Sequence, residues 1–265
     1  MANRTLATLS TVLNFAVDRE WIDANPAGRL RKPTVEVSRE RVLTDHEIRT
    51  LWQALDAAEQ AYKAIADDGR RVTVKRLDGE TPLLRPTFAD WLRLRLLTGQ
   101  RGGEVLAMRR DDVDLEAAVW TVPATIAKNK SAHTVPLSTQ ALLIVQRRID
   151  ALDEGCPWLF PNDRDTGPAK DRAKKVLVSD FLPEAADVRG HDLRRTAASG
   201  MGRLGITRET IARVLNHVDR GPRSTSVYDR FDRLPEKRAA LLRWAEELTR
   251  IVEKRPARKV VKLGR

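Results

Sequence analysis

Arg101 lies in a segment whose residue types suit an anionic ligand. Within Thr98 to Glu104 (TGQRGGE), glycines on both sides of the arginine allow the backbone to turn sharply and bring the guanidinium close to a ligand. A phosphate is the ligand that such an arginine suits. An ordinary turn between two helices, with Arg101 paired to Glu104, is the simpler interpretation of this segment taken alone.

His191 and Arg194 form a second candidate group. They follow Gly190 in GHDLRRT, which opens a predicted helix, and because they are three residues apart they share one face of that helix. The positive end of the helix dipole favours an anion at the same place, so a phosphate fits between the two side chains. Arg195 points elsewhere, and we expect it to form a surface ion pair. The alternative is that His191 only caps the helix.

Tyr228 is a candidate nucleophile and follows His217 by eleven residues. The chain has 2 tyrosines; Tyr62 lies in a helix-to-insertion stretch with Lys63 as its basic neighbour, whereas Tyr228 stands in SVYDR with more cations nearby. A phenol with a pKa of about 10 is ionised in roughly one molecule per thousand at pH 7, so a nucleophilic tyrosine needs cations or a base beside it. The alternative is a tyrosine that only packs on the last helix.

Lys128 completes the set of candidate chemical groups. It lies in AKNK, between two predicted strands, where a lysine can reach a nucleic-acid groove or protonate a departing oxygen. Lys130 is a rival for either role. Most hairpin lysines only increase solubility, which is the alternative for both residues.

The elements that must position these residues are mostly helical. A capping box formed by Thr44 and Glu47 marks one helix start. Residues 66–86 break the helical pattern with an Asp-Gly turn and an alternation of Val72 and Val74, which indicates a loop or a small hairpin. The expected fold class is mainly α with a small antiparallel β-sheet (α+β). Its predicted strands cover residues 119–122 and 134–137, and its predicted helices cover 1–30, 88–97, 191–204, 207–216 and 235–252, with another after Ser138.

The chain is expected to divide at a linker of residues 31–41 (RKPTVEVSRER), which has no helical period. Residues 1–30 read as one amphipathic helix that stops at Asn25-Pro26. One helix cannot fold alone, so we expect the N-terminus to be the end of something longer. Residues 42–252 form the main domain. Residues 253–265 are expected to be a disordered basic arm, with six cations and no acid after Glu253.

The composition favours a polyanionic partner. Lys and Arg total 48 against 37 acidic residues, which gives a net charge of +11 and a pI of about 10.2. Nucleic acid is the leading candidate. No apolar run approaches the roughly 20 residues of a membrane span and no signal pattern is present, so we expect a cytoplasmic protein. The single Cys156 excludes an internal disulfide, and without CxxC or HExxH spacing no metal or other cofactor is expected.

Taken together and in this order, the segments resemble the catalytic domain of the tyrosine recombinase family, which includes phage and genomic-island integrases. The resemblance covers about residues 42–252. The family pattern is an arginine after a Thr-Gly turn, a hairpin lysine, a His-x-x-Arg helix, a Leu-x-His and a tyrosine about ten residues later. Residues 133–138 (HTVPLS) and 228–238 look like the genomic-island subgroup, which favours Lys128 over Lys130. The matching residues are Arg101, Lys128, His191, Arg194, His217 and Tyr228.

The resemblance implies an enzyme that cuts and rejoins DNA through a 3′-phosphotyrosine, without metal or nucleotide. The implied partner is a double-stranded DNA attachment site. The resemblance implies that a homotetramer binds this DNA, that the protein is a monomer when free, and that it is associated with the nucleoid. The implied roles are phosphate neutralisation by Arg101 and Arg194, proton movement through His191, hydrogen bonding of the phosphate by His217, protonation of the leaving 5′ oxygen by Lys128, and attack by Tyr228.

Residues 1–30 resemble the last helix of the core-binding domain that precedes the catalytic domain in this family. The resemblance therefore implies a truncated chain that recognises its DNA site weakly. Two other functions stay open: type IB topoisomerase-like relaxation of DNA by a monomer, and DNA binding by a catalytically silent remnant. RNA binding is a remoter alternative, because the sequence has no RNP-like aromatic motif.

Overall fold

The computed structural model of the chain describes residues 2–35, 40–67, 86–162, 166–169, 178, 181–182, 185, 187–217 and 233–256. The chain divides into two compact units, Met1–Glu40 and Arg41–Arg265, which we describe separately. Three sequence predictions lie outside the described residues: the hairpin around Val72 and Val74, the tyrosine Tyr228, and the basic arm beyond residue 256.

The first unit contains helix α1 (Ala2–Asp18), which is shorter than predicted. The prediction of one helix over residues 1–30 was wrong, because the backbone closes the helix at Glu20, whose φ is 58°. Glu20 N donates to Val17 O at 2.9 Å and Trp21 N donates to Ala16 O at 2.9 Å, the hydrogen-bond pair of a Schellman motif. Glycine usually holds the left-handed position of this motif, so a glutamate there carries no sequence signal.

Asn25, which was expected to stop the helix, instead fastens the returning chain to α1. Its Nδ2 donates to Asn14 Oδ1 at 2.6 Å and to Ser10 O at 3.2 Å, and its Oδ1 accepts from Ala27 N at 2.8 Å. The described part of α1 has no buried residue. Among the described residues of the first unit Ala27 alone is buried, so local hydrogen bonds organise this unit more than a core does.

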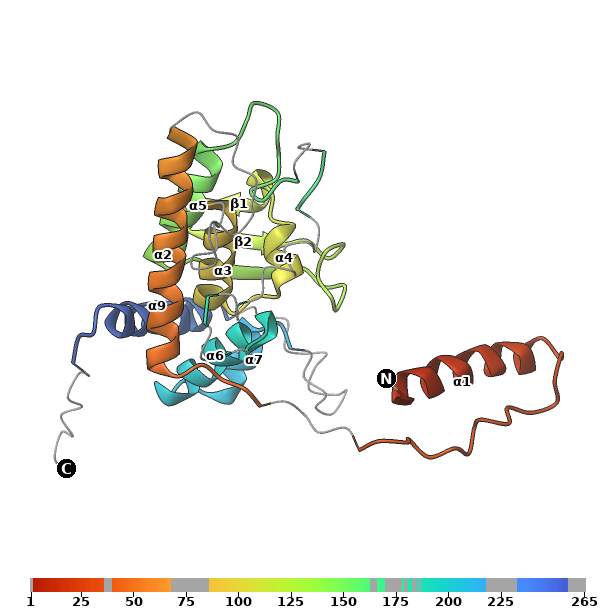
Figure 1. The fold of residues 1–265 in the computed structure, drawn as a ribbon. Coiled ribbons are helices and arrows are strands. Elements are labelled where there is room, and N and C mark those ends of the chain that lie inside the picture. Colours follow the sequence, from red (N-terminus) through yellow and green to blue (C-terminus); the bar gives the residue numbers. More distant parts are fainter. Residues whose placement is uncertain are drawn as a thin grey trace. The chain divides into compact units, whose positions relative to one another are not determined.

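The second unit is mostly helical and carries one small sheet (Figure 1), so the predicted fold class is confirmed. The sheet is antiparallel with the strand order β1-β2-β3. The two-residue strand β1 was not predicted, because it is too short to show an alternating pattern. The strands are β1 (Val113–Asp114), β2 (Val119–Val122) and β3 (His133–Pro136), and the helices are α2 (Asp45–Asp67), α3 (Pro86–Thr98), α4 (Gly102–Leu106), the 3-10 helix η1 (Arg110–Asp112), α5 (Thr139–Asp150), α6 (Gly190–Arg203), α7 (Arg208–Val214) and α9 (Leu234–Val252).

Helix α3 lies at the centre of this unit and packs against α2, α5, α6 and α9 (Figure 1). Because it meets neighbours on several sides, it buries leucines around its whole circumference, including Leu92, Leu94 and Leu96. Helix α9 is joined to it by Trp244, which is fully buried and donates from Nε1 to Leu96 O at 2.8 Å. A Cβ at Gly200 would lie 2.1 Å from the Trp244 ring, so α6 packs against α9 only because position 200 has no side chain.

Local sequence signals set the helix starts and the sheet. The predicted capping box is present, since Thr44 N donates to Glu47 Oε2 at 2.8 Å and Glu47 N donates to Thr44 Oγ at 3.2 Å. An additional hydrogen bond from Arg41 lowers the pKa of Glu47 to about 2. In the sheet, Val122 pairs with His133, so residues 123–132 connect β2 to β3. No helix within the described ranges combines the length and the apolar character needed to cross a membrane.

Candidate functional site

Arg101 follows a sharp turn at the end of α3 and serves as the N-cap of α4. The turn is made by Gly99, whose φ is 67°, so the predicted need for glycine is confirmed there. Gly102 is needed for another reason: a Cβ at this position would lie 3.0 Å from the side chains of Arg95 and Trp91. The glycines around Arg101 therefore serve both backbone conformation and close packing.

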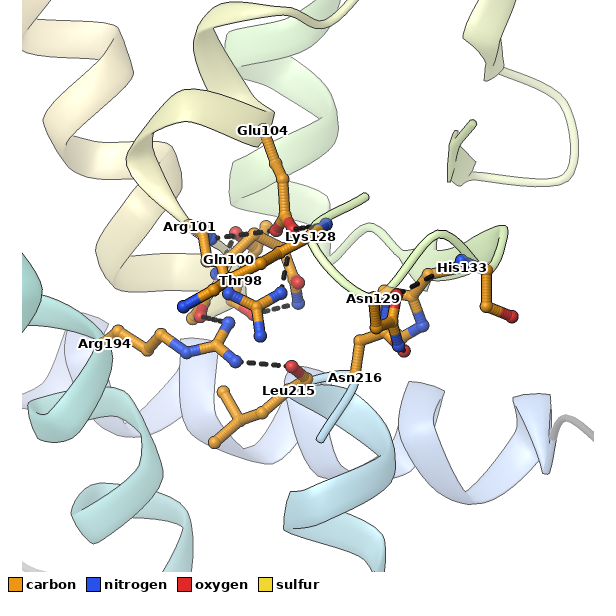
Figure 2. A network of polar contacts seen from close by, with 12 residues as sticks. Thr98, Gln100, Arg101, Glu104, Lys128, Asn129, His133, Arg194, Leu215 and Asn216 are labelled. Carbon is orange, nitrogen blue, oxygen red and sulfur yellow. Dashed lines mark hydrogen bonds and ion pairs between the residues drawn. The ribbon is translucent and has the colours of Figure 1, made fainter. Parts of the chain in front are cut away.

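Glu104 is the carboxylate that holds Arg101 in place. It is 5% exposed and accepts hydrogen bonds from Arg101 N at 3.2 Å and Arg101 Nη1 at 2.8 Å. Its Oε1 also accepts from Lys128 N at 3.4 Å, which links α4 to the β2–β3 connection (Figure 2). The simple ion pair considered for this segment is thus present, but it belongs to a larger network. The Arg101 side chain is 23% exposed and stays accessible to a ligand.

Arg194 is buried, with 3% exposure, and bridges two segments that are far apart in the sequence. Its Nη1 donates to Gly99 O at 2.8 Å, and its Nη2 donates to Leu215 O (Figure 2). Burial, and then the charge of Arg101, lower the pKa of Arg194 to about 10, so the guanidinium is still protonated at pH 7. These carbonyls use two of its five N–H donors.

His191 lies in the first turn of α6 and is exposed. The hydrogen bond that caps this helix runs from Arg189 N to Asp192 Oδ2 at 2.8 Å, so Asp192 rather than His191 caps it. Arg195 forms the expected ion pair, at 2.8 Å, but its partner is the buried Asp192 rather than a surface acid. Desolvation by the surrounding protein atoms lowers the pKa of His191, and the charges of Arg195 and Arg194 lower it further. His191 is therefore neutral at pH 7.

His217 follows α7 in the segment of residues 215–217, which we call the α7 exit. Partial burial lowers the pKa of His217, and the charges of Arg194, Arg101 and His191 add to this effect. Arg101 therefore lies within electrostatic reach of Arg194, and both arginines and His191 lie within electrostatic reach of His217. The structure thus brings together four of the predicted site residues, which come from α4, α6 and the α7 exit.

The last residue of α7 and the α7 exit are held by side chains from three other segments. Val214 O accepts from Gln100 Nε2 at 2.8 Å and contacts the ring Nε2 of His133 at 3.0 Å. Leu215 O accepts from Arg194, as described above. Together these contacts place the histidine that ends the segment beside the arginines.

Lys128 lies exposed in the β2–β3 connection, as the sequence predicted. Its backbone is tied to the Arg101 segment through Glu104, and its neighbour Asn129 contacts the α7 exit. The rival Lys130 lies in the same connection, with a left-handed φ of 56°. The predicted nucleophile Tyr228 lies outside the described residues.

Arg95 was missed by the sequence analysis and lies beside this site. It is 7% exposed, stacks 4.5 Å above the Trp91 ring centroid and donates from Nη2 to Gly190 O. A Cβ at Gly190 would lie 2.8 Å from its guanidinium, so Arg95 packs between the segments that carry Arg101 and His191. Burial lowers the pKa of Arg95 to about 10. The available signal was that Arg95 is one of two arginines in the run LRLRLL, whose other residues are all leucine.

The arrangement can bind and neutralise one phosphate group, because guanidinium and imidazole donors from separate elements converge on the same region. Neutral histidines beside these cations can also accept a proton. Among the side chains that the structure describes, no three His, Cys, Asp or Glu residues gather as ligands for a metal ion.

The comparison with protein families matches residues 41–233 to the phage integrase family. The integrase of Enterobacteria phage P4 is 23% identical over 264 residues, which cover 94% of this chain and 55% of that protein. The prophage integrase IntA of Escherichia coli K12 is 31% identical over 163 residues, which cover 57% of this chain and 36% of that protein. The chain thus spans about half the length, or less, of these curated relatives.

Solved structures share the fold at low sequence identity. An integrase from mycobacterium phage Brujita has a TM-score of 0.54 and 16% identity, covering 92% of this chain and 73% of that one. A lambda integrase dimer bound to a COC′ core site has a TM-score of 0.55 and 17% identity, covering 81% of this chain and 71% of that one. Since the family match spans most of the second unit, the chain belongs to the phage integrase family.

Proposed function

We propose that residues 42–252 form the catalytic domain of a site-specific DNA recombinase. It cleaves and rejoins DNA strands through a 3′-phosphotyrosine on Tyr228. The observation that carries the proposal is that Arg194 joins the turn before Arg101 to the segment that ends in His217, through hydrogen bonds to Gly99 O and Leu215 O. The charges of Arg194, Arg101 and His191 also lower the pKa of His217. Membership of the phage integrase family supports it.

The arginines act on the scissile phosphate. Arg101 and Arg194 neutralise its non-bridging oxygens and stabilise the charge that develops as the phosphorus becomes five-coordinate. Arg101 reaches the phosphate from the partly exposed N-cap of α4, and Arg194 offers the donors that Gly99 and Leu215 leave unused. His217 donates a further hydrogen bond to the phosphate. Because these groups supply the positive charge themselves, the step requires no metal ion.

Proton transfer accompanies the exchange of bonds. The Tyr228 oxygen forms a bond to phosphorus while the bond from phosphorus to the 5′ oxygen breaks. His191 takes the phenol proton, and its lowered pKa favours this role because the ring is neutral at pH 7. Lys128 gives a proton to the departing 5′ oxygen. The phosphotyrosine link preserves the bond energy, so a 5′ hydroxyl of a partner strand reseals the DNA without ATP.

The proposed partner is a double-stranded DNA attachment site, bound by a homotetramer that joins two sites. The net charge of +11 supports a polyanionic partner. The proposed assembly follows a structural neighbour, a lambda integrase tetramer bound to a Holliday junction, which has a TM-score of 0.54 and 18% identity and covers 82% of this chain and 58% of that one.

The test is the capture of a covalent DNA adduct. The chain is incubated with a pool of nicked duplexes whose central sequence is randomised, so that cleavage releases a short fragment and traps the protein on the DNA. Adducts are separated under denaturing conditions and their DNA is sequenced. We expect adducts from the wild type and from Tyr62→Phe, the control at the only other tyrosine, and none from Tyr228→Phe.

The outcomes separate the proposal from its alternatives. An adduct that survives in Tyr228→Phe, or no adduct from the wild type, contradicts the proposal. DNA binding without an adduct indicates the catalytically silent remnant. Relaxation of supercoiled plasmid by the monomer, without preference for any sequence in the pool, indicates topoisomerase-like activity instead.

A further inference from the structure

Two asparagine side chains join the β2–β3 connection to the α7 exit. Asn129 Nδ2 donates to Asn216 Oδ1 at 2.7 Å, and Asn216 Nδ2 donates back to Asn129 Oδ1 at 3.2 Å (Figure 2). The two residues are 87 positions apart in the sequence. Asn129 directly follows Lys128, and Asn216 directly precedes His217. The pair therefore links the two short segments that carry these candidate site residues.

The chain around each asparagine is also constrained. Asn129 Oδ1 also accepts from Ser131 N at 3.3 Å, which fixes the amide within the turn. Asn216 has a φ of 49°, a left-handed conformation that asparagine tolerates better than most residues. On the chain just before Asn216, the carbonyl of Leu215 is held by Arg194. The α7 exit is thus an anchored support, and the β2–β3 connection is the part that the amide pair secures.

The lysine needs such a support because its side chain has little order of its own. Lys128 is exposed and carries a flexible four-carbon stem. The backbone of Lys128 is also held by the Glu104 side chain, because Lys128 N donates to Glu104 Oε1 at 3.4 Å, a distance that is long for a hydrogen bond. The amide pair, at 2.7 and 3.2 Å, is the closer tether.

We propose that Asn129 and Asn216 are positioning residues that hold the Lys128 turn against the His217 turn, so that the Lys128 ammonium meets the departing 5′ oxygen. The inference rests on the proposed function. In that step the P–O5′ bond breaks, the bond from Tyr228 to phosphorus forms, and one proton moves from Lys128 to the 5′ oxygen. The asparagines touch neither substrate nor reacting atoms; they act only through Lys128.

The experiment compares two leaving groups on one selected DNA sequence. The duplex recovered by adduct capture is made once with an ordinary scissile phosphate and once with sulfur in place of the bridging 5′ oxygen. A thiolate leaves without being protonated, so cleavage of the sulfur substrate does not need a general acid. The variants are Asn129→Ala, Asn216→Gly and both together; glycine is chosen at position 216 because it accepts the positive φ.

Each single variant is expected to cleave the ordinary substrate about 10- to 100-fold more slowly, as misplacement of a catalytic group by about 1 Å does. The sulfur substrate is expected to be cleaved within about twofold of the wild-type rate, because no proton transfer is required. The cleavage rate of the double variant is expected to lie within about twofold of the rate of the slower single variant, because the two residues act as one unit.

Two controls calibrate these rates. Lys128→Ala is expected to show the same rescue by sulfur after a larger loss, on the order of 10²- to 10⁴-fold. Ser131→Ala removes a neighbouring side chain but keeps the backbone N–H that donates to Asn129 Oδ1. The cleavage rate of this variant is expected to match that of the wild type. Thermal unfolding of every variant verifies that each remains folded.

Three results overturn the inference. Equal losses on both substrates indicate a general disturbance of the site rather than misplacement of Lys128. Wild-type rates in both asparagine variants show that the pair positions nothing. If the wild type forms no adduct at all, the proposed function fails and this inference fails with it. If the wild type cleaves DNA and the asparagine variants cleave it at the same rate, only this inference fails.

Discussion

Replacing Glu104 by glutamine tests whether this carboxylate organises the site. Glu104 is 5% exposed, and its two oxygens accept from Arg101 N, Arg101 Nη1 and Lys128 N at 3.2, 2.8 and 3.4 Å. Glutamine has almost the same shape but only one acceptor oxygen. If that oxygen faces Arg101 Nη1 and Lys128 N, the new NH₂ group faces Arg101 N–H. One backbone donor then loses its acceptor.

The expected cost of Glu104→Gln follows from these contacts. A buried donor left without a partner costs about 1–3 kcal/mol, and converting a charged hydrogen bond to a neutral one costs about 1 kcal/mol more. The sum is about 2–4 kcal/mol. Because the Arg101 side chain is 23% exposed, water replaces part of what is lost. We therefore expect the free energy of unfolding to fall by about 2 kcal/mol.

The assay is urea-induced unfolding followed by tryptophan fluorescence, with Asp111→Asn as the matched control. Asp111 is 74% exposed and lies 3.7 Å from Arg109, so the same chemical change there should alter the free energy of unfolding by less than about 0.5 kcal/mol. If Glu104→Gln and Asp111→Asn differ by less than about 0.5 kcal/mol, the reasoning about Glu104 is refuted.

Two further predictions concern packing and pH. Gly200→Ala places a Cβ 2.1 Å from the buried ring of Trp244 and should lower the free energy of unfolding by about 1–3 kcal/mol or more. The control is Gly202→Ala, whose Cβ would lie 3.9 Å from the nearest atom and which should be neutral or stabilising by up to about 1 kcal/mol. Equal urea midpoints for the two variants would contradict this prediction. The pKa of His191 lies below its ordinary 6.5, first through burial and then through the charge of Arg195, so its neutral form persists below pH 6.5 and the acid limb of DNA cleavage should lie there. Arg195→Gln should raise that pKa and move the acid limb upward, and an unchanged His191 titration by NMR would rule out this cause.

Local features were predictable from the sequence because they depend on residues within one turn of each other. The Thr44 and Glu47 capping box, the helix that begins after Ser138 and the Gly99 turn are all formed as expected. Each is a short-range hydrogen bond or a backbone conformation that the residue type itself favours. The end of α1 was mispredicted because its residue type does not favour its conformation: Glu20 adopts a left-handed conformation that glycine usually holds.

The sequence by itself determined which chemical groups are present, in what order, and on which kind of element. The order of Arg101, Lys128, His191, Arg194, His217 and Tyr228 was enough to indicate the family that the comparison then matched. The cause is that periodicity and capping act locally, so they place a residue on a helix or in a turn without reference to the rest of the chain.

Only the tertiary structure decided which side chains hold the site together. Arg194 spans 95 positions to Gly99, and Asn129 spans 87 positions to Asn216. Arg95, a charged residue in an apolar helix, is buried between two segments that are distant in sequence. These contacts form because helices and strands pack at particular distances and angles, and no local pattern of residues encodes that packing.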